Sequence, residues 1–574
     1  MKLYPLAKLL LAAALTLCQL DTHAASQAPV AAEHGMVVTA QHLATNAGID
    51  VLKAGGNAVD AAVAVGYTLA VVYPAAGNLG GGGFMTIQLA NGRKAFLDFR
   101  EKAPLAASES MYLDKEGNVV PDLSTYGHLA VGVPGTVSGL ETARAKYGTL
   151  NRTPLLAAAI KYAQEGFVLE QGDIDMLMTA TDAFKKDPAS AAIFLNKGEP
   201  FKVGQKLVQK DLANTLRRIR SKGADGFYKG PIGAAIVASS WAGGGILMQA
   251  DFDRYQTREL APIECTYRGY GIVSAPPPSS GGVAICEMLN ILEGYPLKEL
   301  GFRSAQSVQY QIEAMRHAFV DRNNYLGDPD FVDNPLDHLL DKDYAAQIRA
   351  VISANKAGDS SGIMPGVAPH EGNNTTHYSV IDKWGNAVSV TYTLNDWFGA
   401  KVTAAKTGVL LNNEMDDFTI KTGTANLYGL VQGEANKIER EKRPLSSMSP
   451  TIVTREGKPV MVLGTPGGSR IITTVLLTIL NVIDYGMDVQ EAVDAPRFHQ
   501  QWLPDATNVE PYALSPDTRK ILEGWGQKFG DPPPANQVAA ILVGAPRLDG
   551  EPIGNNRYYG AIDPRRNSGL ASGY

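Results

Sequence analysis

Apolar residues recur at helical spacing along much of the first 350 residues. Residues 40–53 carry them on one face, and the pattern stops at Gly55-Gly56, as expected at a helix C-terminus. Residues 58–72 are almost all apolar, so we expect a buried helix with Asp60 as the one charge near its start. The stretch from about 155 to 350 is expected to be mainly helical. Helices are predicted over residues 136–147, 155–164, 209–222, 283–292 and 304–325.

Shorter apolar runs bounded by turn residues predict strands. Residues 84–89 and 95–100 flank Asn91-Gly92, a favoured two-residue turn, which predicts a β-hairpin. Residues 129–133 are predicted to form another strand, ended by Pro134-Gly135. The glycine-rich residues 77–83 lack the Gly-Lys-Ser/Thr ending of a phosphate loop, and no helix follows them. We expect these glycines to let two backbones approach closely at a sheet edge.

The pattern changes after a polar, Pro- and Gly-rich connector over residues 360–374. Residues 376–381 and 387–393 are apolar at odd and even positions, which predicts strands in a sheet covered on both faces. If Ile381 pairs with Ala387 across the intervening turn, counting back puts Thr375 opposite Thr393. A slip of one residue would separate them. The register therefore predicts two neighbouring threonine hydroxyls.

A second glycine loop joins a short strand to a helix. Residues 460–463 are strand-like, residues 464–469 read Gly-Thr-Pro-Gly-Gly-Ser, and residues 470–483 have helical character. Backbone N–H groups at a helix N-terminus form a natural anion site. The pattern fits a plain strand-to-helix connection equally well. A further helix starting at Ser515-Pro516 and strands near 538–543 and 558–562 complete the chain.

Composition narrows the class of protein. With 45% hydrophobic and 19% charged residues, the chain of 574 residues should fold around a large core. The net charge of −6 gives no basic footprint, so we expect no nucleic-acid partner. After the first residues, no run reaches the ~18 apolar residues of a membrane helix, so we expect no membrane span.

The first residues have the features of a signal peptide. Lys2 and Lys8 precede the apolar residues 9–17, and small residues follow at Ala24 and Ala25. We expect residues 1–24 to be removed and the protein to be periplasmic or secreted. Leu17 is too bulky for the position before a lipidated Cys18, which argues against a lipid anchor.

Cysteine and histidine usage suggests neither a metal site nor a catalytic thiol. Removal of Cys18 leaves Cys265 and Cys286, which are expected to be packing residues, although a single bridge is possible in an oxidising compartment. The nine His are scattered, and H-E-x-x-H does not occur. We expect no metal and no cofactor.

Three polar segments are candidates for chemistry. Thr375 and Thr376 are ordinary strand formers by themselves, and their surroundings also match glycosylation sequons. The acidic residues within 410–418 could be solvated, bind a metal or hold an ammonium group. Residues 444–450 form a hydroxyl-rich loop, and Arg100 ends the predicted hairpin at a position where an arginine is commonly a surface residue.

Five motifs, taken together and in order, resemble the γ-glutamyltranspeptidase (glutathione hydrolase) family of N-terminal nucleophile hydrolases. The resemblance covers essentially all of the chain after the signal peptide. The motifs are Asp98-Phe99-Arg100-Glu101, Thr-Thr-His-Tyr-Ser at 375–379, Leu-Asn-Asn-Glu-Met-Asp-Asp-Phe at 411–418, Pro-Leu-Ser-Ser-Met-Ser-Pro at 444–450, and Gly467-Gly468-Ser469-Arg470.

The resemblance implies an α+β fold, the four-layer αββα sandwich of this superfamily. It also implies a precursor that cuts itself between Asn374 and Thr375. The products would be a large subunit of residues 25–374 and a small subunit of residues 375–574, which stay together.

The resemblance also implies roles for individual residues. Thr375 matches the nucleophile, Thr393 the threonine that hydrogen-bonds it, and Tyr428 the tip of a lid loop. The remaining positions match an arginine and two serines that bind the substrate α-carboxylate (Arg100, Ser446, Ser447), acceptors for its α-ammonium (Asn395, Glu414, Asp417) and an oxyanion hole (Gly467, Gly468).

The implied chemistry suits these groups. A freed α-amine has a reference pKa of ~7.7–8.0, so roughly a tenth is unprotonated at pH 7 and can act as the base for its own hydroxyl. Thr375 then needs no histidine, and His377 is interpreted as structural. The expected substrates are glutathione and other γ-glutamyl compounds, with water, amino acids or dipeptides as acceptors.

Two alternatives remain open from the sequence. A related acylase, of the cephalosporin acylase or poly-γ-glutamate depolymerase type, would keep Thr375 and the glycines but lack part of the glutamate-binding set. An exported binding protein with a catalytically dead fold would have lost a catalytic position, and none is replaced here.

Overall fold

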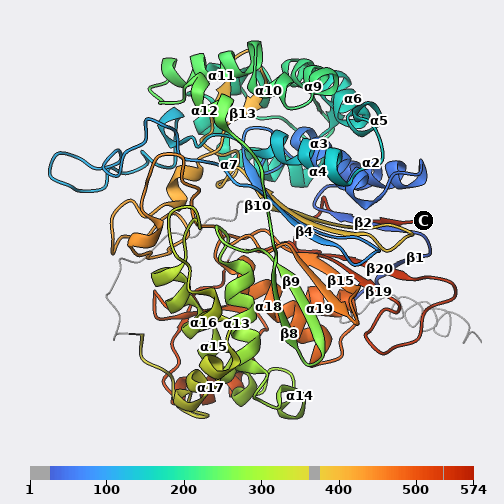
Figure 1. Ribbon diagram of the computed structural model, residues 1–574, viewed down its shortest axis with the longest axis vertical. Helices are drawn as coiled ribbons and strands as arrows, with labels where there is room; N and C mark the ends of the chain where they lie inside the picture. Colours follow the sequence, from blue (N-terminus) through green and yellow to red (C-terminus); the bar gives the residue numbers. More distant parts are fainter. Residues whose placement is uncertain (1–25, 361–374, 534) are drawn as a thin grey trace, which may run out of the picture.

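The computed structural model describes residues 26–360, 375–533 and 535–574. Two seven-stranded sheets pack face to face, and helices cover the outer face of each, which gives four layers (Figure 1). The predicted αββα sandwich is therefore confirmed. The predicted signal peptide, Cys18, the connector at 361–374 and Asn374 lie outside the described residues.

The two sheets mix strands from distant parts of the chain. One sheet has the order β1 (Val30–Ala32), β20 (Tyr558–Ile562), β19 (Ala539–Val543), β15 (Lys458–Gly464), β14 (Thr451–Arg455), β9 (Tyr270–Ser274), β8 (Ile263–Tyr267). The other has the order β21 (Leu570–Gly573), β2 (Met36–Thr39), β10 (Thr375–Ile381), β11 (Ala387–Thr393), β3 (Gly82–Gln88), β4 (Lys94–Phe99), β7 (Arg258–Leu260). Two short strand pairs lie outside these sheets in the described residues, β5 (Phe167–Val168) with β6 (Lys206–Leu207) and β12 (Thr403–Ala404) with β13 (Val409–Leu410). A small three-stranded sheet has the order β16 (Phe498–His499), β17 (Thr507–Val509), β18 (Phe529–Gly530).

The helices form the two outer layers. Against the sheet that contains β10 lie α2 (His42–Lys53), α3 (Ala58–Val72), α4 (Thr136–Tyr147), α5 (Arg152–Leu155), α6 (Ala157–Glu165), α7 (Gln171–Phe184), α8 (Pro188–Phe194), α9 (Lys210–Lys222), α10 (Asp225–Tyr228), α11 (Pro231–Ala242) and α12 (Gln249–Arg254). On the other side lie α13 (Gly281–Leu292), α14 (Leu297–Leu300), α15 (Ala305–Tyr325), α16 (Leu336–Leu339), α17 (Lys342–Val351), α18 (Arg470–Ile483), α19 (Val489–Asp494) and α20 (Pro516–Gly524).

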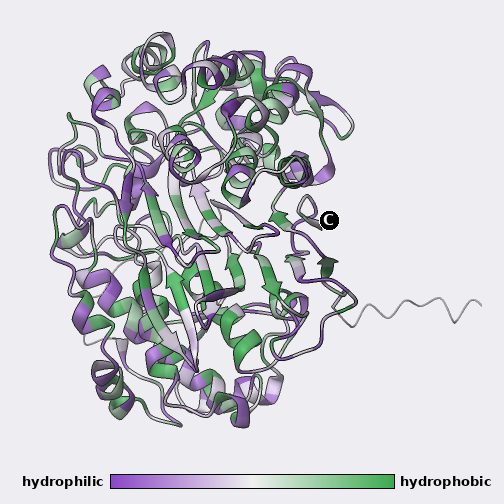
Figure 2. Cartoon of the chain, turned by 45° about the vertical axis from the view of Figure 1, so that its right-hand side comes forward, coloured by the Kyte–Doolittle hydropathy of each residue, from purple (hydrophilic) through white to green (hydrophobic). Residues whose placement is uncertain are grey.

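Three large clusters of buried hydrophobic side chains fill the spaces between the four layers. One lies between α2, α3 and the outer face of the sheet that contains β10, one lies between the two sheets, and one surrounds α13, α15 and α18. Figure 2 shows hydrophobic residues gathered along the strands and along the helix faces turned towards them. Every residue of β10 and β11 is buried, which confirms the sheet predicted to be covered on both faces.

Most predicted helices lie within one or two residues of their expected bounds, but one strand prediction was wrong and one hairpin was not predicted. Residues 129–133 form no strand; His128–Ala130 is a short 3-10 helix, and Val133 makes an isolated bridge to Lys102. The mainly helical stretch also contains the hairpin of β8 and β9. Its turn has positive φ at Arg268 (47°) and Gly269 (84°), and arginine is an uncommon first residue for such a turn, so the usual sequence signal was missing.

The glycines before β3 do allow close approach of two backbones. A Cβ on Gly80 would lie 2.0 Å from the Leu410 carbonyl oxygen, and one on Gly81 would lie 2.0 Å from that of Thr393. Their expected place at a sheet edge was wrong, because β3 lies between β11 and β4 in the sheet interior.

Cys265 of β8 and Cys286 of α13 form a disulfide. The expectation of two packing residues is corrected here, and the alternative of one bridge is the one realised. The bond fixes an outer helix to the edge strand of its sheet. Within the described ranges, no helix has the length and hydrophobicity needed to cross a membrane.

Candidate active site

The site is built where β10 begins and β11 ends. The two strands pair in the predicted register, with Thr375 opposite Thr393. Alternation along β10 turns Thr375 towards the other sheet, on the same face as Ser379, whose hydroxyl donates to the Ala539 carbonyl of β19. The two threonines therefore face the loop between β15 and α18, which carries Gly467 and Gly468.

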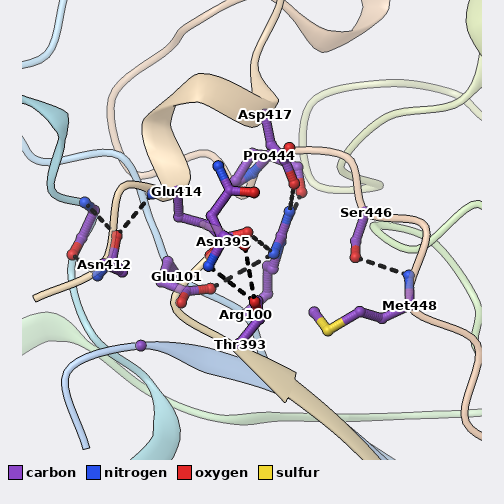
Figure 3. A network of polar contacts seen from close by, with 12 residues as sticks. Arg100, Glu101, Thr393, Asn395, Asn412, Glu414, Asp417, Pro444, Ser446 and Met448 are labelled. Atoms are coloured by element: carbon purple, nitrogen blue, oxygen red, sulfur yellow. Dashed lines mark hydrogen bonds and ion pairs between the residues drawn. The ribbon is translucent and has the colours of Figure 1, made fainter. Parts of the chain in front are cut away.

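A small cavity lies at this point. Most of the predicted site residues line it, although they come from strand ends and loops far apart in the sequence (Figure 3). The lining consists of Arg100, Arg322, Thr375, Thr393, Asn395, Glu414, Asp417, Tyr428, Leu430, Leu445, Ser446, Ser447, Met448, Gly468 and Ile471. Gly467 lies one residue behind Gly468 and is not part of the described lining.

Arg100 follows β4 directly and is 1% exposed, so it is not the surface residue that its position alone would suggest. Its guanidinium forms ion pairs with Glu414 and Asp417 and donates to the Pro444 carbonyl at 3.2 Å (Figure 3). Burial disfavours its charge, but the neighbouring carboxylates more than offset this, so the pKa of Arg100 lies above its ordinary value. The carboxylate-binding and ammonium-binding groups were predicted as separate sets, yet here they bind each other.

The acidic segment is buried, so its solvated interpretation was wrong. Glu414 and Asp417 lie in the short 3-10 helix η3 (Glu414–Asp417), and burial raises the pKa of Glu414 although Arg100 opposes the shift. Asp416 accepts from the Ser124 hydroxyl at 2.7 Å and from the Leu427 backbone at 2.9 Å, and burial raises its pKa to about 6. Across the described ranges, no group of three or more His, Cys, Asp or Glu side chains could hold a metal ion.

Asn395 ties the end of β11 to the rest of the site. Its backbone N–H donates to the Thr393 hydroxyl at 2.9 Å, and its side chain donates to the Asn413 carbonyl at 3.0 Å. Its φ of 74° lies in the left-handed region, which asparagine tolerates better than most residues. This bend fixes where the Thr393 hydroxyl points.

Tyr428 closes the cavity from one side. Its hydroxyl donates to the Asn395 carbonyl at 2.7 Å, and its side chain is 5% exposed. The ring lies so close to Gly468 that a Cβ there would be 2.3 Å from the ring carbon Cδ1. A Cβ on Gly467 would lie 2.2 Å from Asn536 Oδ1, so both positions require glycine, with φ of 132° and 57°.

The hydroxyl-rich loop is fixed against the turn that precedes α13. The Ser446 N–H donates to the Pro278 carbonyl, and the Ser280 N–H and hydroxyl donate to the Ser446 carbonyl at 2.8 and 2.7 Å. The Ser447 hydroxyl accepts from Arg322 Nη2 at 3.3 Å. Sequence reasoning missed Ser280 and Arg322, because Arg322 is one of many polar residues in a long helix and no motif marks it.

The His377 ring lies between the two sheets, against Gly464 of β15, and does not line the cavity. Its ring is hydrogen-bonded to the hydroxyls of Thr391, at 2.8 Å, and Ser379, at 3.1 Å. Burial lowers its pKa to about 3, and burial lowers that of His499 to about 3 as well.

These two histidines predict acid lability. Below pH 6.5 each of these two histidines binds a proton in the unfolded chain but not in the folded protein. Their contribution to the free energy of unfolding should therefore fall by about 1.4 kcal/mol per histidine for each pH unit, down to about pH 3. At pH 5 the combined cost would be about 4 kcal/mol. Urea denaturation between pH 4 and 8 measures it. Buried carboxyls such as Asp416 act on the slope in the opposite direction, so the test is the difference between variants. His377→Gln should reduce the slope by about 1.4 kcal/mol per pH unit relative to wild type, and His34→Gln at an exposed position should leave it unchanged; equal slopes in both variants would contradict the prediction.

Comparisons with known proteins agree with this geometry. The family described as Gamma-glutamyltranspeptidase matches residues 44–573. The chain is 72% identical to a glutathione hydrolase proenzyme of Pseudomonas sp. strain A14, covering 100% of both chains. The crystal structure of Helicobacter pylori gamma-glutamyltranspeptidase is 43% identical in sequence, with a TM-score of 0.56, and the match covers 60% of this chain and 97% of the chain in that structure. That of cephalosporin acylase from Bacillus halodurans is 27% identical, with a TM-score of 0.83, and covers 97% and 98%.

Proposed function

Because this chain belongs to the γ-glutamyltranspeptidase family, we propose that it is a self-cleaving proenzyme that acts as a γ-glutamyltransferase and glutathione hydrolase. The observation that supports this most strongly is the cavity that joins Thr375 and Thr393 to Arg100, Glu414 and Asp417. It combines a candidate nucleophile with groups of both charges, as the α-amino acid end of a γ-glutamyl donor requires.

The self-cleavage step begins with the Thr375 hydroxyl attacking the Asn374 carbonyl. The acyl bond moves from nitrogen to oxygen, and water then hydrolyses the ester, which leaves Asn374 with a carboxylate and Thr375 with a free amine. Residues 1–24 are removed on export, and the fragments are residues 25–374 and 375–574. Each sheet contains strands from both fragments, which favours a stable association after the cut.

The exposed amine then serves as the base for catalysis. It takes the proton of the Thr375 hydroxyl while the oxygen attacks the γ-carbonyl of the donor, and it returns a proton to the leaving amine. The N–H groups of Gly467 and Gly468 stabilise the tetrahedral oxyanion, for which one donor is typically worth ~2.7–4 kcal/mol. The Thr393 hydroxyl, held by the Asn395 N–H, orients the nucleophile.

Charge exchange explains selection of the γ-glutamyl end. The donor carboxylate replaces Glu414 and Asp417 as the ion-pair partner of Arg100 and also binds Ser446 and Ser447. The donor ammonium replaces Arg100 as the partner of Glu414 and Asp417 and also binds Asn395. An Arg fork suits a carboxylate in a two-point contact. The γ-glutamyl-Thr375 ester then passes to water, or to an amino acid or dipeptide.

The disulfide bears on the compartment, and the lining of the cavity bears on the rival acylase function. The Cys265–Cys286 disulfide supports an exported, periplasmic or secreted protein, because such bonds persist in oxidising compartments. A cephalosporin acylase shares the fold, but the complete glutamate-binding set around the cavity favours a γ-glutamyl donor.

N-terminal sequencing and mass spectrometry test the proposal directly. The smaller fragment should begin Thr-Thr-His-Tyr. Incubation with glutathione and glycylglycine should give glutamate and γ-glutamyl-glycylglycine, with a transient increase in mass on that fragment. An intact polypeptide that still consumes glutathione would disprove the mechanism.

A further inference from the structure

Arg322 is a second buried guanidinium in the wall of the same cavity. It lies in the last turn of α15 and is 1% exposed. Arg100, Arg316, Arg443 and Arg497 are also buried, and each forms an ion pair with a carboxylate. Arg322 forms no ion pair with any described carboxylate.

All the hydrogen-bond acceptors around Arg322 are neutral. Its Nε donates to the Ser280 hydroxyl at 3.1 Å, and its Nη1 donates to the side-chain oxygens of Asn323 at 2.7 Å and Gln432 at 3.0 Å. Its Nη2 donates to the Ser447 hydroxyl at 3.3 Å, and the other hydrogen on Nη2 has no acceptor among the described residues. That nitrogen is the end of the side chain nearest the serine loop.

This leaves a buried guanidinium with no described carboxylate in contact with it. Burying an ion without a counter-ion is costly, and a helix C-terminus offsets only part of that cost. Burial accordingly lowers the pKa of Arg322 to about 10, which Asp417 opposes. Glu414 and Asp417 contact Arg100 and not Arg322, so an incoming carboxylate is the group that could pair with Arg322 directly.

Arg322 also fixes the two serines of the expected carboxylate subsite. It holds the Ser447 hydroxyl directly, and it holds Ser446 through Ser280, whose hydroxyl accepts from Arg322 and donates to the Ser446 carbonyl. One side chain thus sets the positions of both hydroxyl-bearing residues opposite Arg100.

We propose that Arg322 is a specificity-determining residue that recognises the α-carboxylate of the donor, through its Nη2 edge and the Ser447 hydroxyl that it orients. This inference rests on the proposed function. Arg322 and Arg100 then form a cationic pair around the carboxylate, in which Arg100 becomes available only when the donor ammonium replaces it on Glu414 and Asp417.

The test compares three p-nitroanilide donors: γ-glutamyl, glutaryl (no ammonium) and 4-aminobutyryl (no α-carboxylate). In Arg322→Met, kcat/KM for the γ-glutamyl and glutaryl donors should fall roughly 30-fold, mainly through KM, because a charged hydrogen bond is lost. The 4-aminobutyryl donor should change less than about twofold. Arg322→Lys should lie between wild type and Arg322→Met.

A matched control separates recognition from stability. Arg316→Met removes a buried arginine of the same helix that pairs with Asp505 and does not line the cavity, so any loss should be equal for the three donors. Inhibition constants of glutarate and 4-aminobutyrate give the same comparison without turnover. If Arg322→Met does not fold, Ser280→Ala removes one of its bonds and should show a smaller loss with the same selectivity.

Equal losses on all three donors in the Arg322 and Ser280 variants would overturn the inference and leave a structural role. That failure is distinct from failure of the proposed function. In the latter case the wild-type protein would neither split at Thr375 nor consume the γ-glutamyl donor.

Discussion

The Thr375→Ala protein is expected to remain a single polypeptide and to have no measurable γ-glutamyl transfer. The substitution removes the hydroxyl proposed for self-cleavage and for attack on the donor. The other hydroxyls that line the cavity, on Thr393, Ser446 and Ser447, are assigned to positioning and binding. Loss of a nucleophile of this kind costs at least about 10⁴-fold in kcat. Gel electrophoresis after expression and a glutathione assay provide both measurements.

The adjacent threonine provides the control. Thr376 faces the helical layer, and its buried hydroxyl has no hydrogen-bond partner among the described residues, so Thr376→Val keeps the shape and removes only that hydroxyl. It should split and turn over donor much as wild type does. Two fragments from Thr375→Ala would show that the chain is cut by another group, and the assignment of the nucleophile would be wrong.

The Arg100→Lys protein should split normally but lose roughly 10²-fold in kcat/KM for γ-glutamyl donors. Lysine retains one positive charge beside Glu414 and Asp417, so the buried carboxylates keep a partner and the fold survives. It cannot reproduce the two-point contact of a guanidinium with a carboxylate. The loss should appear with γ-glutamyl p-nitroanilide and be much smaller with its 4-aminobutyryl analogue.

Arg93→Lys, just before the other end of β4, is the matched control. Arg93 is mostly exposed and pairs with Glu259 at 3.4 Å, and exposed pairs of this kind contribute little. Its turnover should match wild type. Unchanged turnover in Arg100→Lys would mean that the carboxylate is bound elsewhere, with Arg322 as the next candidate.

The local sequence pattern was enough to predict those helices and strand pairings that depend on residues close together in the sequence. The helix over residues 58–72, the helix over 136–147 and the threonine register across the β10–β11 turn follow from periodicity, capping and a short loop. Where the local pattern is weak, the prediction fails: the hairpin of β8 and β9 was missed because its Arg268-Gly269 turn is not a typical hairpin turn sequence. The family motifs indicated most of the residues that line the cavity.

What the sequence determined by itself was therefore the elements, the position of Thr375 opposite Thr393, and the set of residue types available for chemistry. The tertiary structure alone decided that Arg100 binds Glu414 and Asp417, more than 300 residues away, and that Arg322 enters the same cavity without a carboxylate of its own. Periodicity reports which face of an element is buried but carries no information about which distant side chain it meets. The electrostatics of the site depend on these long-range contacts. An unpaired charge costs free energy when it is buried, and the folded structure decides which charges are buried and which are paired.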